Sequence, residues 1–157
     1  MIEQQLALPE VELVIGYRDC EAAVFDKFLV LFKNVWEDIP ETDRQIIANR
    51  LKWAQQTLPL IGLRSGIWLL PSITAHAAYV HSKGGVVIFN AFKLNNALDF
   101  SYTEIIRHEL AHVWQAGTGM LEGLLSRDHL EAHADWMAKY RLFRPGWRPI
   151  GQSAGPS

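Results

Sequence analysis

The 157-residue sequence is poor in several features that mark particular classes of protein. It has a single cysteine, Cys20, which excludes an internal disulfide. Its formal net charge is only −2, so its composition gives no reason to expect a nucleic acid or an anionic membrane as a partner. No apolar run reaches the length of a membrane span, and the first ten residues lack the cationic segment of a signal peptide. We therefore expect a cytoplasmic protein, with export by a route that needs no cleaved signal as the alternative.

The strongest chemical signal is the sequence HELAH, an H-E-x-x-H motif that runs from His108 to His112. Apolar residues recur at helical spacing around it, and no proline interrupts residues 102–115, so we predict a helix there. Residues four apart lie on one face of a helix, which lets His108 and His112 reach one zinc ion. Glu109 then lies beside the metal, where it can take a proton from zinc-bound water.

A catalytic zinc usually takes three protein ligands, so a third ligand is expected downstream. Residues 127–143 have the apolar spacing of a second helix, on which Glu131 and Asp135 share one face. Glu131 fits as the third ligand, and Asp135 fits as a carboxylate that orients a ligand histidine. His129 and His133 point elsewhere on this helix, but either would replace Glu131 if the helix met the site in another register.

An H-E-x-x-H motif followed by E-x-x-x-D on a second helix resembles the signature of the gluzincin metallopeptidases, the thermolysin-like enzymes. The similarity is closest to short bacterial domains with H-E-x-x-H-x-x-Q followed by E-x-x-A-D, and it covers residues 86–140. It implies one Zn²⁺ per chain and a peptide or protein substrate. The residues to which it assigns roles are the ligands His108, His112 and Glu131, the general base Glu109, and Asp135 bonded to His108.

The resemblance also implies roles for residues outside the two motifs. Thermolysin-like enzymes bind the substrate main chain along an edge strand that ends in the tripeptide Asn-Ala-Phe, which here begins at Asn90. Asn90 and Ala91 are therefore candidate substrate-binding residues, and the alternative is a turn in which Asn90 bonds to backbone. The oxyanion of the reaction needs a hydrogen-bond donor, for which Tyr140 and Arg141 are candidates near the end of the second helix.

The predicted fold class is α+β, a minimal zincin-like domain in which a small mixed sheet packs on helices that include the H-E-x-x-H helix. Residues 1–143 are expected to form this single metallopeptidase domain, and residues 144–157 an irregular tail rich in Pro, Gly and Ser. Asp19 and Asp128 are predicted as the N-caps of the first and last helices. The predicted strands are residues 11–17, 66–70, 77–81 and 86–89, and the predicted helices are residues 19–37, 43–57, 102–115 and 127–143.

The sequence thus predicts a zinc-dependent metallopeptidase that hydrolyses peptide bonds by Glu109-assisted attack of zinc-bound water. One alternative is a zinc-binding module of the same fold without turnover, which acts as a binding or toxin-like protein. Another is a DNA-associated zincin with a third histidine ligand, which predicts a basic patch that the sequence does not show. A purely structural role for the two helices requires both motifs to be coincidences. The sequence names neither the substrate nor the oligomeric state.

Overall fold

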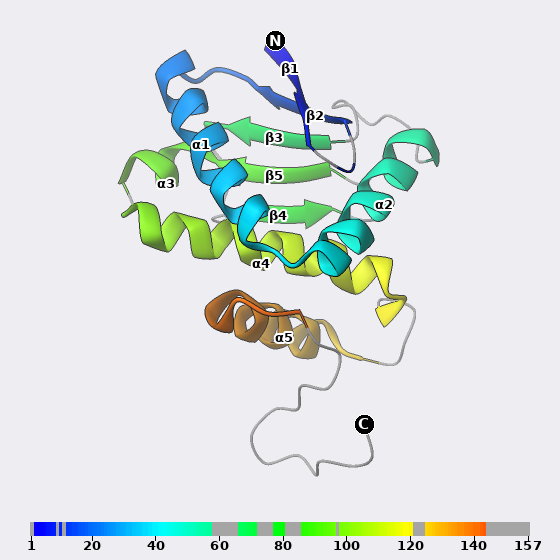
Figure 1. The fold of residues 1–157 in the computed structure, drawn as a ribbon. Helices are drawn as coiled ribbons and strands as arrows, with labels where there is room; N and C mark the ends of the chain where they lie inside the picture. The colour runs from blue at the N-terminus through cyan, green and yellow to red at the C-terminus, as the bar shows by residue number, and fades with distance from the viewer. Residues whose placement is uncertain are drawn as a thin grey trace.

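The computed structural model of the chain describes residues 2–8, 10, 12–57, 66–71, 77–80, 86–96, 98–120 and 125–143 (Figure 1). These residues have an α+β fold built on a five-stranded mixed sheet with the order β1-β2-β3-β5-β4. The inner strands β2, β3 and β5 are parallel, and the edge strands β1 and β4 are each antiparallel to their neighbour. The strands are β1 (Ile2–Ala7), β2 (Glu12–Tyr17), β3 (Gly66–Leu70), β4 (Ala77–Val80) and β5 (Val86–Asn90).

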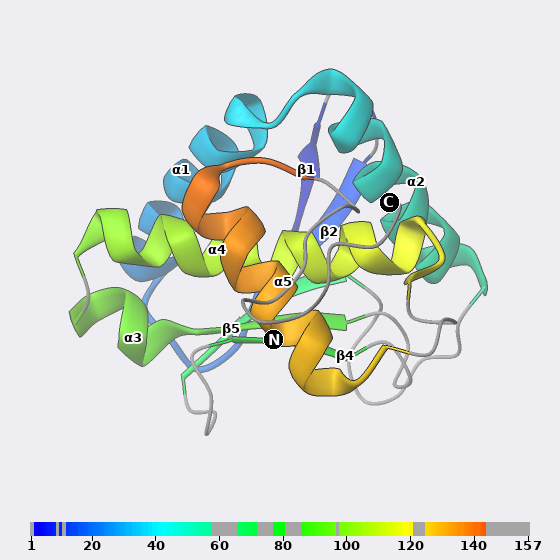
Figure 2. The ribbon, with the colours of Figure 1, turned by 90° about the horizontal axis from the view of Figure 1, so that it is seen from below.

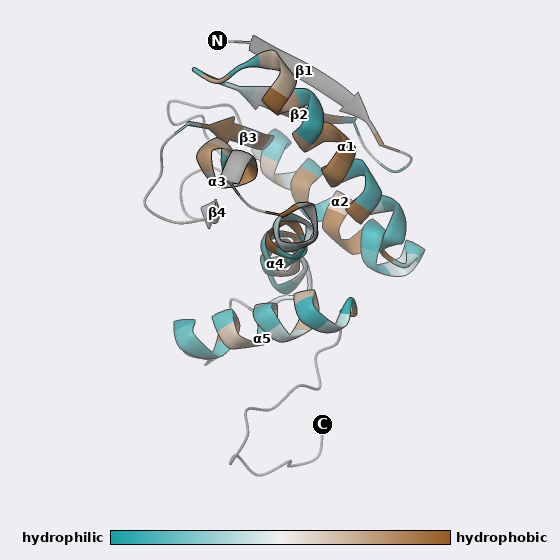
Figure 3. Cartoon of the chain, turned by 90° about the vertical axis from the view of Figure 1, so that its left-hand side faces the viewer, coloured by the Kyte–Doolittle hydropathy of each residue, from teal (hydrophilic) through white to brown (hydrophobic). Residues whose placement is uncertain are grey.

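Some helices pack directly against the sheet, and α5 packs outside them. Two of them, α1 and α2, cover one face of the sheet, while α4 runs along the β4 edge and packs against β4, α1 and α2 (Figures 1 and 3). Helix α5 lies on the far side of α4 from the sheet. Within the described part of the chain, no helix is both long and apolar enough to cross a membrane. The helices are α1 (Ala22–Asp38), α2 (Glu41–Thr57), α3 (Ala91–Asn96), α4 (Asp99–Gly117) and α5 (Arg127–Tyr140).

An aromatic core fills the space between the sheet, α1 and α4. Phe28 of α1 lies at its centre, with ring centroids 5.1 Å from Phe89 of β5 and 6.5 Å from Tyr102 of α4. The hydroxyl of Tyr102 donates a hydrogen bond of 3.0 Å to the carbonyl of Asn90, which ties the start of α4 to the end of β5. On the sheet, Gly16 lies under the buried ring of Trp68, where any Cβ would come within 2.4 Å of ring carbons. The helix that carries the H-E-x-x-H motif is therefore mounted on a rigid apolar base.

The mixed sheet was predicted, as were the two helices before and the two helices after its strands at residues 66–89, but several boundaries differ. Helix α1 begins at Ala22, because Asp19 has the left-handed φ of 55° and cannot serve as the N-cap. At α5 the N-cap is Ser126, whose hydroxyl accepts from the backbone N–H of His129, so the prediction of Asp128 is wrong. Strand β1 and helix α3 were not predicted. The segment between the predicted strands 77–81 and 86–89, and the predicted irregular tail at residues 144–157, lie outside the described residues.

Candidate metal centre

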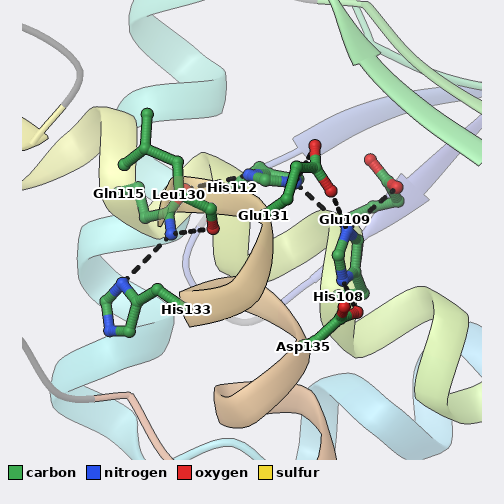
Figure 4. A network of polar contacts seen from close by, with 8 residues as sticks. All are labelled: His108, Glu109, His112, Gln115, Leu130, Glu131, His133 and Asp135. Carbon is green, nitrogen blue, oxygen red and sulfur yellow. Dashed lines mark hydrogen bonds and ion pairs between the residues drawn. The ribbon is translucent and has the colours of Figure 1, made fainter. Parts of the chain in front are cut away.

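The predicted site residues meet where α5 crosses α4 (Figure 2). Helix α4 presents His108 and His112 toward α5, and α5 presents Glu131 and Asp135 toward α4 (Figure 4). Each pair is four residues apart on its own helix, so each helix contributes two side chains to one interface. The two residue pairs that the motifs predicted on separate helices thus face each other in the structure.

Three possible ligand atoms converge at this crossing. Nε2 of His108 lies 3.1 Å from Nε2 of His112 and 3.0 Å from Oε2 of Glu131. Nε2 of His112 lies 3.1 Å from Oε1 of Glu131. With one atom taken from each residue, the three lie within 4.8 Å of one another, and in the described part of the chain this is the group of side chains that could hold a metal ion.

Each of the two histidines has a side-chain oxygen of another residue close to its Nδ1. Oδ1 of Asp135 lies 2.7 Å from Nδ1 of His108, a contact of hydrogen-bond length that lacks hydrogen-bond alignment. Oε1 of Gln115 lies 2.9 Å from Nδ1 of His112. Because both partners are oxygen acceptors, they favour a proton on Nδ1 and leave a lone pair on Nε2 of each ring. Two imidazole lone pairs and one carboxylate therefore face a common point.

Glu109 lies beside this point, and one of its carboxyl oxygens makes no hydrogen bond. Its side chain is buried, with Oε1 3.9 Å from Nε2 of His108, and Oε2 has no hydrogen-bond partner. Burial, followed by the neighbouring carboxylates of Glu131 and Asp135, raises the pKa of Glu109 to about 8. Because its charged form would be neither solvated nor paired, the carboxyl group of Glu109 holds a proton more tightly than an ordinary glutamate does.

The ionisation of His112 also suits a ligand. Burial, and then the nearby ring of His108, lower the pKa of His112 below its ordinary value, although Glu131 and Gln115 act in the opposite direction. A lowered pKa favours the neutral imidazole, which is the form that binds metal ions.

The donor set and its spacing fit a zinc ion. Zinc bonds of about 2.0–2.1 Å in a tetrahedral site put neighbouring ligand atoms about 3.3 Å apart. The closest separations here are 3.0 and 3.1 Å. Lone pairs that face one another without a hydrogen between them repel, and a divalent cation would remove that repulsion and offset the negative charge around Glu109.

The predicted substrate-binding residues Asn90 and Ala91 are not where an edge strand would put them. Strand β5, which ends at Asn90, pairs with β3 on one side and β4 on the other, so it cannot add a peptide as a further strand. Asn90 and Ala91 are both buried, and the Asn90 carbonyl accepts the hydroxyl of Tyr102. The expectation that Asn-Ala-Phe ends an edge strand is therefore wrong, because the edge beside α4 is β4.

The predicted oxyanion donor Tyr140 lies away from the ligands. It follows Glu131 by nine residues on α5, which turns it about 180° round the helix from Glu131. Its ring contacts that of Trp136 at 6.1 Å and the ammonium of Lys139 at 5.7 Å, and it is 58% exposed. This geometry gives no support to Tyr140 as the donor. Arg141 lies 3.9 Å from Asp38 of α1 instead.

The alternative histidine ligands lie outside the cluster. His133 is 1% exposed, and its Nδ1 is 3.1 Å from Nε2 of Gln115 rather than at the ligand atoms. His129 is two residues before Glu131 at the start of α5, where its backbone N–H bonds to Ser126. Sequence reasoning left the roles of Gln115 and His133 open, and the available signal was the spacing of one turn between His112 and Gln115.

Comparisons of the chain with protein-family models, with curated proteins and with solved structures found no match. The resemblance to gluzincins therefore rests on the two motifs alone.

Proposed function

We propose that the protein is a zinc-dependent peptidase of zincin-like fold, with zinc held by His108, His112 and Glu131. The observation that carries this proposal is the convergence of two imidazole lone pairs and a carboxylate, at 3.0–3.1 Å, beside the partnerless oxygen of Glu109. Buried carboxylate oxygens in proteins are usually hydrogen-bonded, because an unsatisfied one lowers stability. An unsatisfied acceptor next to three ligand atoms is what a site with a reacting water molecule requires.

Each residue of the site has a proposed role that follows from its position. A zinc ion at the three ligands would supply an acidified water molecule and polarise the scissile carbonyl. Glu109 is the proton acceptor, because Oε2 is free to take a proton and then return it to the leaving amine. Asp135 and Gln115 keep the two histidines turned toward the ligand position.

The edge strand β4 is the proposed binding surface for the substrate. It pairs with β5 on one side, and in the described part of the chain no strand pairs with its other side. It packs against α4, the helix that carries His108 and Glu109. An extended peptide that added to this edge by main-chain hydrogen bonds would lie along the site. This assignment replaces the predicted role of Asn90 and Ala91.

The second candidate function is zinc binding without turnover, in a binding or toxin-like module. The observation that favours it is the direction of Tyr140, which leaves the described residues without an evident donor for the oxyanion. Removal of one such donor lowers kcat by about 10²–10³ in a serine protease. The two candidates predict the same metal content and differ in hydrolysis.

Zinc stoichiometry tests the metal site that both candidates share. We expect one zinc per chain in the wild type and loss or strong weakening in Glu131→Ala, purified in parallel without chelator or histidine tag. Asp128→Ala is the matched control, because it removes an exposed carboxylate from the same helix without touching the ligands. Equal zinc in Glu131→Ala would move the third ligand to another residue, and no zinc in the wild type after reconstitution would refute the proposal.

Peptide hydrolysis then separates the two candidates. A peptide library should be cleaved by the zinc-loaded wild type, and Glu109→Gln should lower the rate by about 10²–10⁴ at unchanged zinc content, since it removes the general base. Full zinc occupancy without cleavage of any library peptide would favour the module without turnover.

A further inference from the structure

Gln115 uses both ends of its amide in contacts at the α4–α5 interface. It is 0% exposed, and both ends of its amide lie within hydrogen-bond distance of a partner. Oε1 lies 2.9 Å from Nδ1 of His112, while Nε2 lies 2.9 Å from the carbonyl of Leu130 and 3.1 Å from Nδ1 of His133. One amide thus links a ligand histidine of α4 to two residues of α5 that flank the ligand Glu131 (Figure 4).

The Leu130 carbonyl decides which way round this amide lies. A carbonyl can only accept, so it must face the NH₂ group of Gln115, and Oε1 must then face His112. Because Oε1 can only accept, the proton of His112 belongs on Nδ1. The remaining N–H of Gln115 points at Nδ1 of His133, which therefore accepts. The donor and acceptor roles of His112, Gln115 and His133 in these contacts therefore all follow from the Leu130 carbonyl.

His133 holds the far end of this chain in place. Its ring is 1% exposed and contacts two indoles, with centroids 6.4 Å from Trp114 of α4 and 6.1 Å from Trp136 of α5. A buried ring in contact with two indoles has little freedom to turn, so its Nδ1 stays directed at Gln115. His133 is therefore a support for Gln115 rather than a spare metal ligand.

We propose that Gln115, supported by His133, is a positioning residue with two effects on the metal centre. It holds His112 in the tautomer with the proton on Nδ1, which leaves Nε2 open toward the ligand position. It also sets the register of α5 against α4 at Leu130, which brings Glu131 to the same point. The consequence for zinc affinity rests on the proposed function, whereas the tautomer and the helix register do not.

The tautomer of His112 can be measured without metal, from two-bond ¹H–¹⁵N correlations of the imidazole at a pH where the rings are neutral. We expect Nδ1–H for His112 in the wild type and a mixture, or Nε2–H, in Gln115→Leu. Gln115→Glu should keep Nδ1–H, because a carboxylate still accepts from His112, but it loses the bond to Leu130. Persistence of pure Nδ1–H in Gln115→Leu would overturn the proposal.

A matched pair at position 133 covers the case in which Gln115→Leu does not fold. Asn offers an oxygen close to where the Nδ1 of histidine lies, so His133→Asn should preserve the acceptor for Gln115. His133→Phe keeps a ring between Trp114 and Trp136 but removes that acceptor. We expect His133→Asn to keep the wild-type tautomer and affinity, and His133→Phe to lose several-fold in affinity. Equal behaviour of the two variants would count against a role for the Nδ1 contact.

Zinc affinity, measured by competition with a chromophoric chelator, gives the second readout. Gln115→Leu should bind zinc about 10–100-fold more weakly, as is typical when a partner of a ligand is removed. If the wild type binds no zinc but shows the pure Nδ1–H tautomer that Gln115→Leu loses, the proposed function fails and the positioning role stands. If zinc binds with wild-type affinity in a folded Gln115→Leu, the positioning role fails and the proposed function stands.

Discussion

The two sides of α4 are built in different ways. The side toward the sheet and α1 carries Tyr102, Ile106 and Leu110, all fully buried and in contact with apolar side chains. The side toward α5 carries His108 and His112, whose nearest contacts there are polar groups of Gln115, Glu131 and Asp135. His108 follows Ile106 by two residues, so the two stripes lie about 200° apart on the helix.

Figure 3 shows the same contrast in hydropathy, with hydrophobic residues concentrated in α1 and β3 and mostly hydrophilic residues in α5. Apolar packing has no direction, so it stabilises the helix but does not orient a side chain. Hydrogen bonds contribute less net stability but fix atoms in direction. The apolar packing and the candidate metal ligands thus lie on opposite faces of one helix, so variants should be able to separate effects on stability from effects on metal binding.

The largest effect on stability should come from the apolar side. Phe28→Ala removes a fully buried ring from the centre of the core, and we expect the free energy of unfolding to fall by about 3–5 kcal/mol. Zinc stoichiometry of the folded variant should stay at the wild-type value, because the ring is remote from the ligands. Val30→Ala, at an exposed position of the same helix, is the control and should change stability by less than about 0.5 kcal/mol. Urea unfolding of metal-free protein measures both.

Glu109→Gln should stabilise the metal-free protein at high pH. The pKa of Glu109 is about 8 in the folded protein and about 4.3 in an unfolded chain. Between these values the folded state holds the extra proton, so stability falls as the pH rises through this window. Glutamine carries no charge, so the variant should exceed the wild type by a few kcal/mol above the window.

The measurement is urea unfolding at several pH values on both sides of that window. Curves that stay parallel for the two proteins would mean that the Glu109 carboxylate is not desolvated as the structure indicates. A stability gain together with the loss of hydrolysis would mark Glu109 as a residue kept for chemistry at the expense of stability.

Asp135→Ala should produce the opposite pattern, with an effect on metal but not on folding. Asp135 is 77% exposed at its side chain, so its loss should change the free energy of unfolding by no more than about 0.5 kcal/mol. Zinc affinity should fall about 10–100-fold, because His108 loses the carboxylate at its Nδ1. Chelator competition measures the affinity, and Asp128→Ala serves again as the control. A large loss of stability without a change in affinity would reverse the assignment of roles.

The smallest effect is expected where a charged contact is long and half exposed. Asp38 at the end of α1 lies 3.7 Å from Arg107 of α4 and 3.9 Å from Arg141 beyond α5. Asp38→Asn should lower the free energy of unfolding by about 0–1 kcal/mol, and added salt should reduce the difference. A larger and salt-independent loss would show that α5 is held to the core by this ion pair as well as by Gln115.

Some of the site followed from local periodicity alone. The i, i+4 spacing of His108 with His112 and of Glu131 with Asp135 predicts that each pair shares a helix face, since it depends only on residues within one turn. Boundaries were less well predicted, because the ends of α1 and α5 depend on backbone conformations at Asp19 and Ser126 that several residue types could adopt. The order of strands was not predictable, because pairing joins segments that are remote in sequence.

The sequence by itself therefore determined the α+β class, the two helices and the candidate ligands, because helical periodicity is a property of neighbours. Only the tertiary structure decided that β4 rather than β5 is the edge beside α4, and that Arg141 lies against Asp38 of α1. It also decided that Gln115 joins α4 to α5 through the Leu130 carbonyl. These relations depend on how one helix or strand lies against another, and packing across long chain separations is not encoded in any local pattern.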